Sequence, residues 1–213
     1  GTVCPGSRRF SSVRRTPVSA PPSLGAWLGW YDRAMVTEPK LSAQEYLAMP
    51  EEPPYSEYVF GEVIRKMAPP KKHVSLVEEF SHFLGGYRRR VGGFSGAEQR
   101  VRFETERGAE FRLPDYAYWA PAKPQGPDET LLPPTLAVEV RSPGESMESQ
   151  RAKCRYYRRY GVDVAWLVDP EARSVEVFED DRDGVQLAND ASLQSVLLPG
   201  FELRVVELFA ALA

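Results

Sequence analysis

The sequence has few cysteines and no long apolar run, and both shortages narrow the class of protein it encodes. Its 213 residues include two cysteines, Cys4 and Cys154, which lie far apart and form no CxxC pair. Two such cysteines make neither a disulfide framework nor a zinc-binding set, so a reducing, cytoplasmic setting is the simplest expectation. No stretch approaches the roughly 20 apolar residues that cross a bilayer, so we expect no membrane span.

Excess positive charge is also missing from most of the chain. The formal net charge is -3, although residues 1–34 contain five arginines and one acid. The rest of the chain is therefore acidic, which argues against strong non-specific attraction to nucleic-acid phosphates. A local basic groove, or a metal ion that inverts the local charge, is still compatible with this composition.

The first 34 residues differ from the rest in composition. They are rich in proline, serine, glycine and arginine, and they show neither helical nor strand periodicity. We expect residues 1–34 to be a disordered or non-native N-terminal extension and residues 35–213 to form one domain. The alternative is an arginine-rich transit peptide or nucleic-acid-binding arm.

The apolar pattern predicts an α/β fold with a mixed β-sheet. Two nearly continuous apolar stretches, "LAVEVR" and "VDVAWLVDP", flank the helical segment "SMESQRAKCRYYRRYG". This order predicts a βαβ unit whose parallel strands are buried on both sides. A second helix is predicted over residues 69–90, two strands around the Phe60-Gly61 turn, and a hairpin over residues 98–121. We therefore predict a mixed sheet with a helix on each face, its elements running strand, strand, helix, three strands, helix and two strands.

Glu139 is out of place in the first of these apolar stretches. Alternate residues of a strand face the same way, so Glu139 shares a side with Arg141, while Val138 and Val140 face the other side. An ionised carboxylate is costly to bury without partners. Glu139 is therefore either functional or explained by an ion pair with Arg141, a solvated strand end or a half-exposed strand.

Asp115 is a second acid in an apolar and aromatic stretch, "RLPDYAYWA". It precedes Glu139 by 24 positions, which leaves room for a strand, a loop and a return. Two acids on adjacent strands repel each other unless a cation or a proton lies between them. Such oxygen ligands suit Mg²⁺ or Mn²⁺. The alternative for Asp115 is an ordinary turn or cap residue.

Lys153 lies on the helix that follows Glu139. Spacings of three, four and seven place it on one face with Tyr156, Tyr157 and Tyr160, which predicts that it faces the sheet. Its long side chain would then reach the acids. The alternative is a lysine whose charged end extends to solvent.

These residues resemble a known pattern. A Pro-Asp strand, then Glu-x-Lys on the next strand, followed by a helix, is the pattern of the PD-(D/E)xK nuclease superfamily, which Asp115, Glu139 and the helix after them resemble. The segments "YSEYVFGEVIRKMAPPKKH", "RLPDYAYW", "LAVEVRSPGES", "KCRYYRRYGVDVAWLVDP", "SVEVF" and "LLPGFEL" resemble the Uma-two family of restriction endonucleases over almost all of residues 41–208. The resemblance implies a restriction-endonuclease-like fold and metal-dependent hydrolysis of phosphodiester bonds.

The resemblance also implies site residues. Asp115 and Glu139 would bind Mg²⁺ or Mn²⁺, Glu62 would match a family acid before the first long helix, and His73 would match a histidine at its start. Glu62 is alternatively a surface acid beside a turn, and His73 a helix-start residue on the core face. The chain departs from the pattern at Arg141, which stands where the motif has lysine.

Because arginine stays protonated, Arg141 cannot act as a base. We expect Arg141 to bind a phosphate or to form an ion pair, and Lys153 to orient the attacking water. Tyr116, Tyr118 and Trp119 either stack on bases or pack in the core.

The sequence therefore predicts an Mg²⁺-dependent endodeoxyribonuclease that binds nucleic acid, with DNA as the expected substrate. A homodimer would place two such sites on the two strands of a duplex by symmetry. Two other hypotheses stay open. One is a catalytically degenerate nuclease fold that binds nucleic acid or protein without cleaving, and the other is a purely structural network of buried charges.

Overall fold

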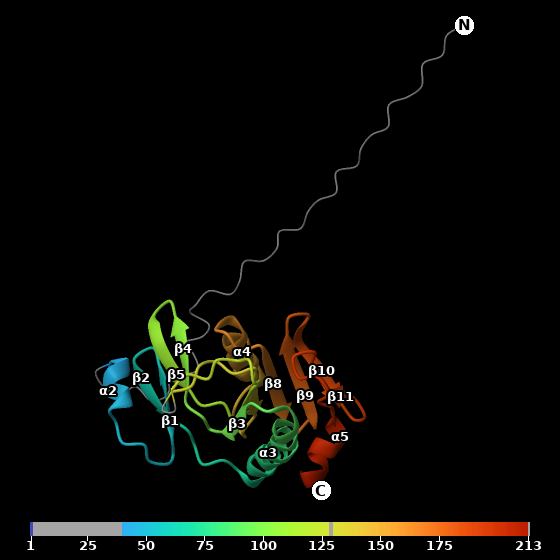
Figure 1. Ribbon diagram of the computed structural model, residues 1–213, viewed down its shortest axis with the longest axis horizontal. Coiled ribbons are helices and arrows are strands. Elements are labelled where there is room, and N and C mark those ends of the chain that lie inside the picture. Colours follow the sequence, from blue (N-terminus) through green and yellow to red (C-terminus); the bar gives the residue numbers. More distant parts are fainter. Residues whose placement is uncertain (2–39, 128–129, 213) are drawn as a thin grey trace. The chain divides into compact units, whose positions relative to one another are not determined.

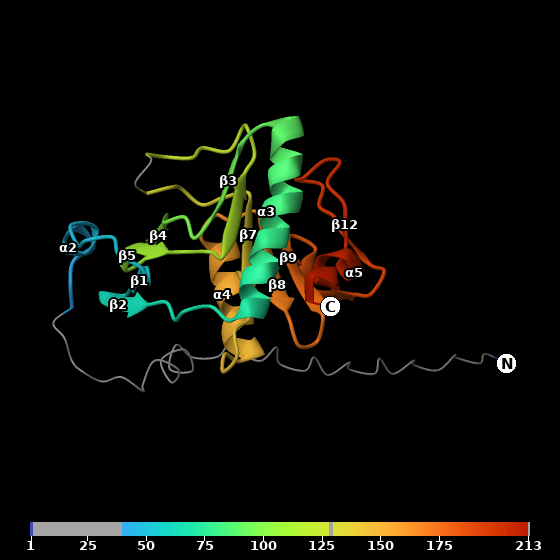
Figure 2. The same ribbon diagram turned by 90° about the horizontal axis from the view of Figure 1, so that it is seen from below.

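The computed structural model describes Gly1 and residues 40–127 and 130–212, shown in Figures 1 and 2. The predicted N-terminal extension, residues 1–34, lies outside the described residues apart from Gly1. None of the helices in the described part of the chain combines the length and apolar character needed to span a membrane.

A six-stranded mixed sheet forms the centre of the fold, with the strand order β10-β9-β8-β7-β6-β3. The strands are β3 (Phe94–Ala97), β6 (Tyr116–Trp119), β7 (Leu136–Val140), β8 (Val164–Asp169), β9 (Ser174–Glu179) and β10 (Arg182–Ala188). Strands β7 and β8 run parallel, and the other neighbouring pairs run antiparallel. The predicted mixed sheet is therefore confirmed.

The parallel pair is joined by helix α4 (Met147–Arg159), as the two apolar stretches predict. The Ser146 hydroxyl caps the start of α4 by accepting a hydrogen bond from the Ser149 N–H. After the helix, Gly161 takes a φ of 102°, which favours glycine and ends the helical path. Every residue of β7 and β8 is buried, because helices cover both faces of this pair.

Helix α3 (Lys71–Val91) covers one face of the central sheet and α4 covers the other, as Figure 2 shows. On α3, Leu76, Phe80 and Leu84 follow helical spacing and pack in one core with Val138 and other residues of β7 and β8. Burying each such side chain contributes about 1.5–3 kcal/mol.

The opposite face has a second core with smaller residues on the sheet. Tyr157 of α4 packs near Ala117 and Ala137, and Cys154 packs against Ala165 and Leu167. These short side chains let α4 lie close to the strands. The charged residues of that helix can therefore reach the sheet.

A smaller antiparallel sheet, with the order β2-β1-β5-β4, lies beside the central sheet. Its strands are β1 (Ser56–Val59), β2 (Glu62–Arg65), β4 (Val101–Thr105) and β5 (Gly108–Arg112). Phe60 and Gly61 form the predicted turn, with φ values of 52° and 88° that suit a two-residue hairpin loop. Helix α2 (Ala43–Leu47) packs Tyr46 on this sheet.

The prediction for the second strand of the hairpin over residues 98–121 is wrong in one respect. The stretch "FRLPDYAYWAP" is not one strand, because β5 belongs to the small sheet and β6 to the central sheet. The division falls at Pro114, which has no N–H to donate to a ladder. Asp115 therefore lies where the chain passes from one sheet to the other.

The C-terminal segment closes the α3 side of the core. It comprises β11 (Ser192–Leu193), β12 (Leu203–Arg204), α5 (Val205–Leu208) and a 3-10 helix over Phe209–Leu212. Phe201 packs edge-on against Tyr87 of α3.

Candidate functional site

Asp115 and Glu139 lie opposite each other at the end of the β6–β7 ladder. Tyr116 pairs with Val138, so the same register continued by one residue places Asp115 across from Glu139. Both side chains are buried, with residue exposures of 3% and 4%. Asp115 Oδ2 accepts a hydrogen bond of 2.8 Å from the Val140 N–H. This bond fixes one oxygen of Asp115 on the neighbouring strand.

Helix α4 brings Lys153 and Tyr157 to Glu139. Lys153 Nζ lies 3.0 Å from Glu139 Oε2, and the Tyr157 hydroxyl donates to Glu139 Oε1 at 2.6 Å. The spacing of four residues sets both side chains on one helical face. The predicted orientation of Lys153 toward the sheet is present in the structure.

Lys66 and His73 approach Asp115 from the other side. Lys66 lies in the segment between β2 and α3, and its Nζ is 2.7 Å from Asp115 Oδ1 and 3.1 Å from the Leu113 carbonyl oxygen. His73, in the first turn of α3, places Nε2 3.5 Å from the same Oδ1. Its Nδ1 is 3.2 Å from the Ser142 hydroxyl. Helix α3 therefore contributes to the same group of charges as α4.

Glu57 of β1 joins the group through Lys153. Glu57 Oε1 lies 3.1 Å from Lys153 Nζ and accepts a hydrogen bond from the Leu113 N–H at 3.1 Å. Its other oxygen is 3.5 Å from Nη1 of Arg112. We call Glu57, Lys66, Asp115, Glu139 and Lys153 the carboxylate–lysine cluster.

Burial and charge act against each other on the acids of the cluster. Burial and the charge of Asp115 raise the pKa of Glu139 to about 7, although Lys153 and Lys66 oppose the rise. Burial also acts to raise the pKa of Glu57, but Lys153, Arg112 and Lys66 outweigh it and lower that pKa to about 2. Asp115 is likewise buried, yet Lys66 and His73 hold its pKa well below the usual range.

The two lysines stay protonated, and the protonated form of His73 is favoured. Burial acts to lower the pKa of Lys153, but Glu139, Glu57 and Asp115 raise it above its ordinary value. Burial opposes the charged form of Lys66 in the same way, and Asp115 overcomes it, so this pKa is also raised. For His73, the hydrogen bond and charge of Asp115 exceed the effect of burial and raise the pKa. The cluster therefore holds two lysine cations close to three buried carboxylates, Glu57, Asp115 and Glu139.

The donor set fits a hard divalent cation. Asp115 and Glu139 offer oxygen atoms only, and Mg²⁺ is commonly bound by one or two carboxylates together with water and substrate phosphates. The charge of Asp115 helps to raise the pKa of Glu139, which shows that a further positive charge would relieve this pair. Within residues 40–127 and 130–212, no group of three or more His, Cys, Asp or Glu side chains is arranged so that these side chains alone would hold a metal ion.

Glu62 lies away from the cluster, and Arg141 forms an ion pair, which is one of the two expectations for it. Glu62 is exposed at the turn end of the β1–β2 hairpin, opposite Val59, and makes none of the contacts of the cluster. Its position is that of the surface acid considered as the alternative. Arg141 Nη2 is 2.8 Å from Asp169 Oδ1, so it has a structural ion pair at the ends of β7 and β8.

The aromatic residues beside Asp115 are core residues. Tyr116, Tyr118 and Trp119 are at most 3% exposed, so in this conformation they are closed to a nucleic-acid base. Trp119 Nε1–H donates to the Leu132 carbonyl oxygen at 2.8 Å, which ties β6 to the loop before β7. Of the two interpretations, base stacking and core packing, the structure agrees with core packing.

Sequence reasoning missed Glu57 and Lys66. Glu57 carries the same signal as Glu139, an acid in a short strand whose neighbours Tyr58 and Val59 are buried. Lys66 follows another basic residue at the end of β2 and has no distinguishing pattern. Only the fold shows that its side chain turns inward to Asp115.

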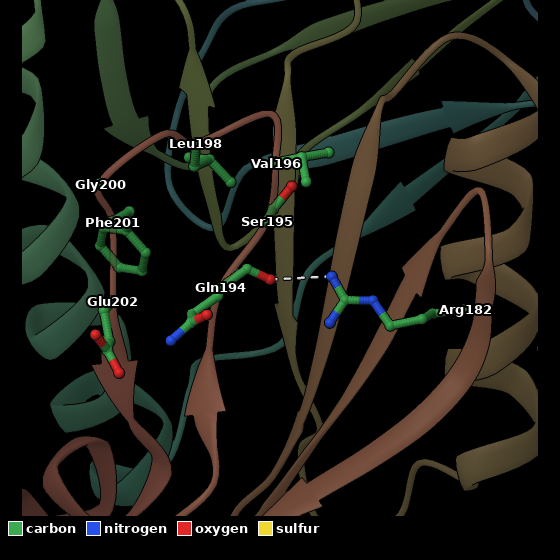
Figure 3. Close-up of a pocket in the computed structure, with 8 residues that line it drawn as sticks. All are labelled: Arg182, Gln194, Ser195, Val196, Leu198, Gly200, Phe201 and Glu202. Atoms are coloured by element: carbon green, nitrogen blue, oxygen red, sulfur yellow. Dashed lines mark hydrogen bonds between the residues drawn. The ribbon is translucent and has the colours of Figure 1, made fainter.

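A separate hollow of about 460 Å³ lies between β10 and the segment from Gln194 to Glu202. Figure 3 shows Arg182 reaching the Gln194 carbonyl oxygen across it, at 2.9 Å. No residue of the carboxylate–lysine cluster lines this hollow. The candidate site is thus separate from this hollow.

Comparison with known proteins gives a family and a fold. The chain is similar to the crystal structure of "a putative nuclease belonging to DUF820" from Anabaena variabilis, with a TM-score of 0.70 and 23% sequence identity. The match covers 80% of this chain and 98% of that one. No curated protein matches the chain. The family model Uma2, described as "Putative restriction endonuclease", matches residues 43–206, so this chain belongs to the Uma2 family.

Proposed function

We propose that the protein is a metal-dependent nuclease that hydrolyses phosphodiester bonds, with DNA as its substrate. The observation that carries this proposal is the pair of buried carboxylates, Asp115 and Glu139, set opposite each other with Lys153 on Glu139. Membership of the Uma2 family supports it. A mixed sheet with the acids at the end of two neighbouring strands supplies the scaffold.

Asp115 and Glu139 are the residues that would hold Mg²⁺ or Mn²⁺. When bound, such a cation polarises a phosphoryl oxygen and lowers the pKa of a coordinated water. Asp115 Oδ2 is engaged by the Val140 N–H, so this acid is already oriented before any ligand arrives. Tyr157 and Lys153 orient Glu139 in the same way from the other side.

Lys153 acts as a cation in this proposal and not as a general base. Its neighbours Glu139, Glu57 and Asp115 raise its pKa, so the ammonium group keeps its protons at neutral pH. A protonated lysine donates hydrogen bonds to the attacking water and stabilises the negative charge that develops on the phosphate. His73 is proposed as a further donor to the substrate phosphate, because it lies 3.5 Å from Asp115 Oδ1 and its pKa is raised.

The test is metal-dependent cleavage by carboxylate variants. Asp115→Asn and Glu139→Gln keep the side-chain volume and remove the charge, and each is expected to lower Mg²⁺-dependent cleavage of a plasmid by at least about 100-fold. Glu104→Gln is the matched control, because Glu104 is an exposed acid paired with Arg102 on β4. Folded variants that cleave like the wild type would overturn the proposal.

A second candidate is a nuclease fold that binds nucleic acid without cleaving it. The observation that favours it is that Lys66 and Lys153 already pair with both central carboxylates. Calorimetric titration with Mn²⁺ separates the two functions. Binding that is lost in Asp115→Asn supports the nuclease, and a complete lack of binding in the wild type supports the non-cleaving protein.

A further inference from the structure

The Lys66 ammonium group contacts Asp115 Oδ1, the oxygen atom that a bound metal ion would need. Asp115 Oδ2 is engaged by the Val140 N–H, which leaves Oδ1 as the oxygen with freedom to bind another group. Lys66 Nζ lies 2.7 Å from this Oδ1. A divalent cation on the same oxygen would face the charge of Lys66 at close range, and like charges at a few ångströms repel strongly in a buried site.

The attachment of Lys66 is weaker than that of Lys153. Besides the Leu113 carbonyl oxygen at 3.1 Å, its second ion-pair partner, Glu98, is 3.5 Å away and has a side chain that is 41% exposed. The two lysine side chains are similarly exposed, at 20% and 18%, but Lys66 comes from the segment between β2 and α3, outside any helix or strand, whereas Lys153 projects from α4. Lys66 can therefore leave Asp115 without breaking a strand ladder or leaving a buried lysine unpaired.

The residues on either side of Lys66 are suited to bind a nucleic-acid phosphate, to which Lys66 can move. Arg65 and Lys71, on either side of it, are exposed, and within the described residues neither has a carboxylate partner. Met67 between them is 87% exposed. This strip of unpaired positive charge, next to the two carboxylates, fits a nucleic-acid backbone, where lysine and arginine bind phosphates.

We propose that Lys66 is an exchangeable cation: it holds Asp115 Oδ1 in the metal-free protein, and it moves to a phosphate of the nucleic acid when a divalent cation is bound. This inference rests on the proposed function, because it requires Asp115 to be a metal ligand. Residues 65–71, from the last residue of β2 to the first of α3, then contact the substrate beside the bond that is cleaved.

The first test measures metal affinity without any reaction. Lys66→Met keeps a long side chain and removes the charge, so Mn²⁺ should bind roughly tenfold more tightly in calorimetry once the competing ammonium group is gone. Lys72→Met is the matched control, since Lys72 pairs with Glu171 on the surface and should leave the Mn²⁺ affinity unchanged. Unchanged or weaker Mn²⁺ binding by Lys66→Met would overturn the proposal.

The second test measures substrate binding. With Ca²⁺ in place of Mg²⁺ to suppress cleavage, Lys66→Met should bind a short DNA duplex about tenfold more weakly in fluorescence anisotropy, because one phosphate contact is lost. Equal duplex binding by wild type and Lys66→Met would contradict the movement of Lys66 to the substrate.

The two proposals fail in different ways. If Mn²⁺ binds through Asp115 but Lys66→Met does not tighten it, only the exchange is wrong. If neither protein binds Mn²⁺, the proposed function fails and the exchange fails with it.

Discussion

The two lysines of the carboxylate–lysine cluster differ in how they are held. Lys153 projects from the middle of α4 and lies between two buried acids, Glu57 and Glu139, at 3.1 and 3.0 Å. Lys66 comes from a connecting segment and has one buried acid, Asp115, at 2.7 Å. One lysine is thus a fixed part of the core, and the other is attached at the edge of the site.

This difference shows how a fold can keep one cation in place and release another. A buried acid that loses its cation is left with an uncompensated charge, which costs several kcal/mol. Removal of Lys153 would take a cation from two buried acids, Glu139 and Glu57, of which Glu57 keeps Arg112 and the Leu113 N–H. Removal of Lys66 would leave only Asp115, which keeps the Val140 N–H and His73 as partners. The loss of stability on removing a lysine therefore rises with the number of buried acids that lose their cation.

The largest loss of stability is expected when Lys153 is replaced. Lys153→Met should lower the free energy of unfolding by about 3–5 kcal/mol, as breaking a buried ion pair does. Lys66→Met should lower it by about 1 kcal/mol, since Asp115 retains the Val140 N–H and His73 as partners. Urea denaturation at pH 7 measures both. Equal losses in the two variants would remove the distinction between a fixed and a releasable lysine.

The next effect concerns Glu57 and depends on pH. Its pKa is lowered from 4.5 to about 2 in the folded protein, so its stabilising contribution is present above pH 4.5 and is lost as the pH falls toward 2. A shift of this size corresponds to roughly 3 kcal/mol. Urea denaturation of Glu57→Gln should show a deficit at pH 7 that narrows between pH 4.5 and pH 2.

Glu104→Gln provides the comparison for this pH series, because Glu104 lies on the surface. We expect its stability to follow that of the wild type at every pH. A deficit in Glu57→Gln that stays constant down to pH 2 would show that packing, and not charge, is the contribution of Glu57.

A smaller loss than those of Lys153→Met and Glu57→Gln is expected when Tyr157 is replaced. Tyr157→Phe removes the hydroxyl that donates to Glu139 Oε1 at 2.6 Å and leaves the ring stacked on Phe103. The loss should be about 1.5–3 kcal/mol, as for a hydrogen bond to a charged group, and below that of Lys153→Met. Thermal denaturation monitored by circular dichroism measures it. A loss as large as that of Lys153→Met would mean that Tyr157 and Lys153 hold Glu139 equally.

The sequence predicted the elements whose pattern is local. The βαβ unit around α4 follows from two apolar stretches and a helical one, and α3 follows from its spaced apolar residues. Strand β3 was missed because "FSGA" is short and contains glycine, and β10 because "RDGVQLA" is largely polar. The residues of these two strands have no strand pattern of their own. Each is held as a strand by its pairing, β3 with β6 and β10 with β9.

The site was predictable only in part. Asp115 and Glu139 are visible as acids in apolar stretches, and Lys153 through its aromatic helical face. The contacts of Glu57 and Lys66 depend on the small sheet meeting the central one near Pro114, a long-range arrangement with no local signal. Glu62 was expected on the resemblance, but the turn at Gly61 leaves it exposed.

The register of β6 against β7 has a consequence for how the chain tolerates insertions and deletions. Asp115 faces Glu139 because Tyr116 pairs with Val138, and not because of the length of the loop between these strands. Residues can therefore be added in that loop while the two acids stay opposite each other. One residue inserted within β7, between Val138 and Glu139, would instead turn Glu139 to the α3 side, away from Lys153. Variation in length is therefore tolerated between these strands and excluded within them.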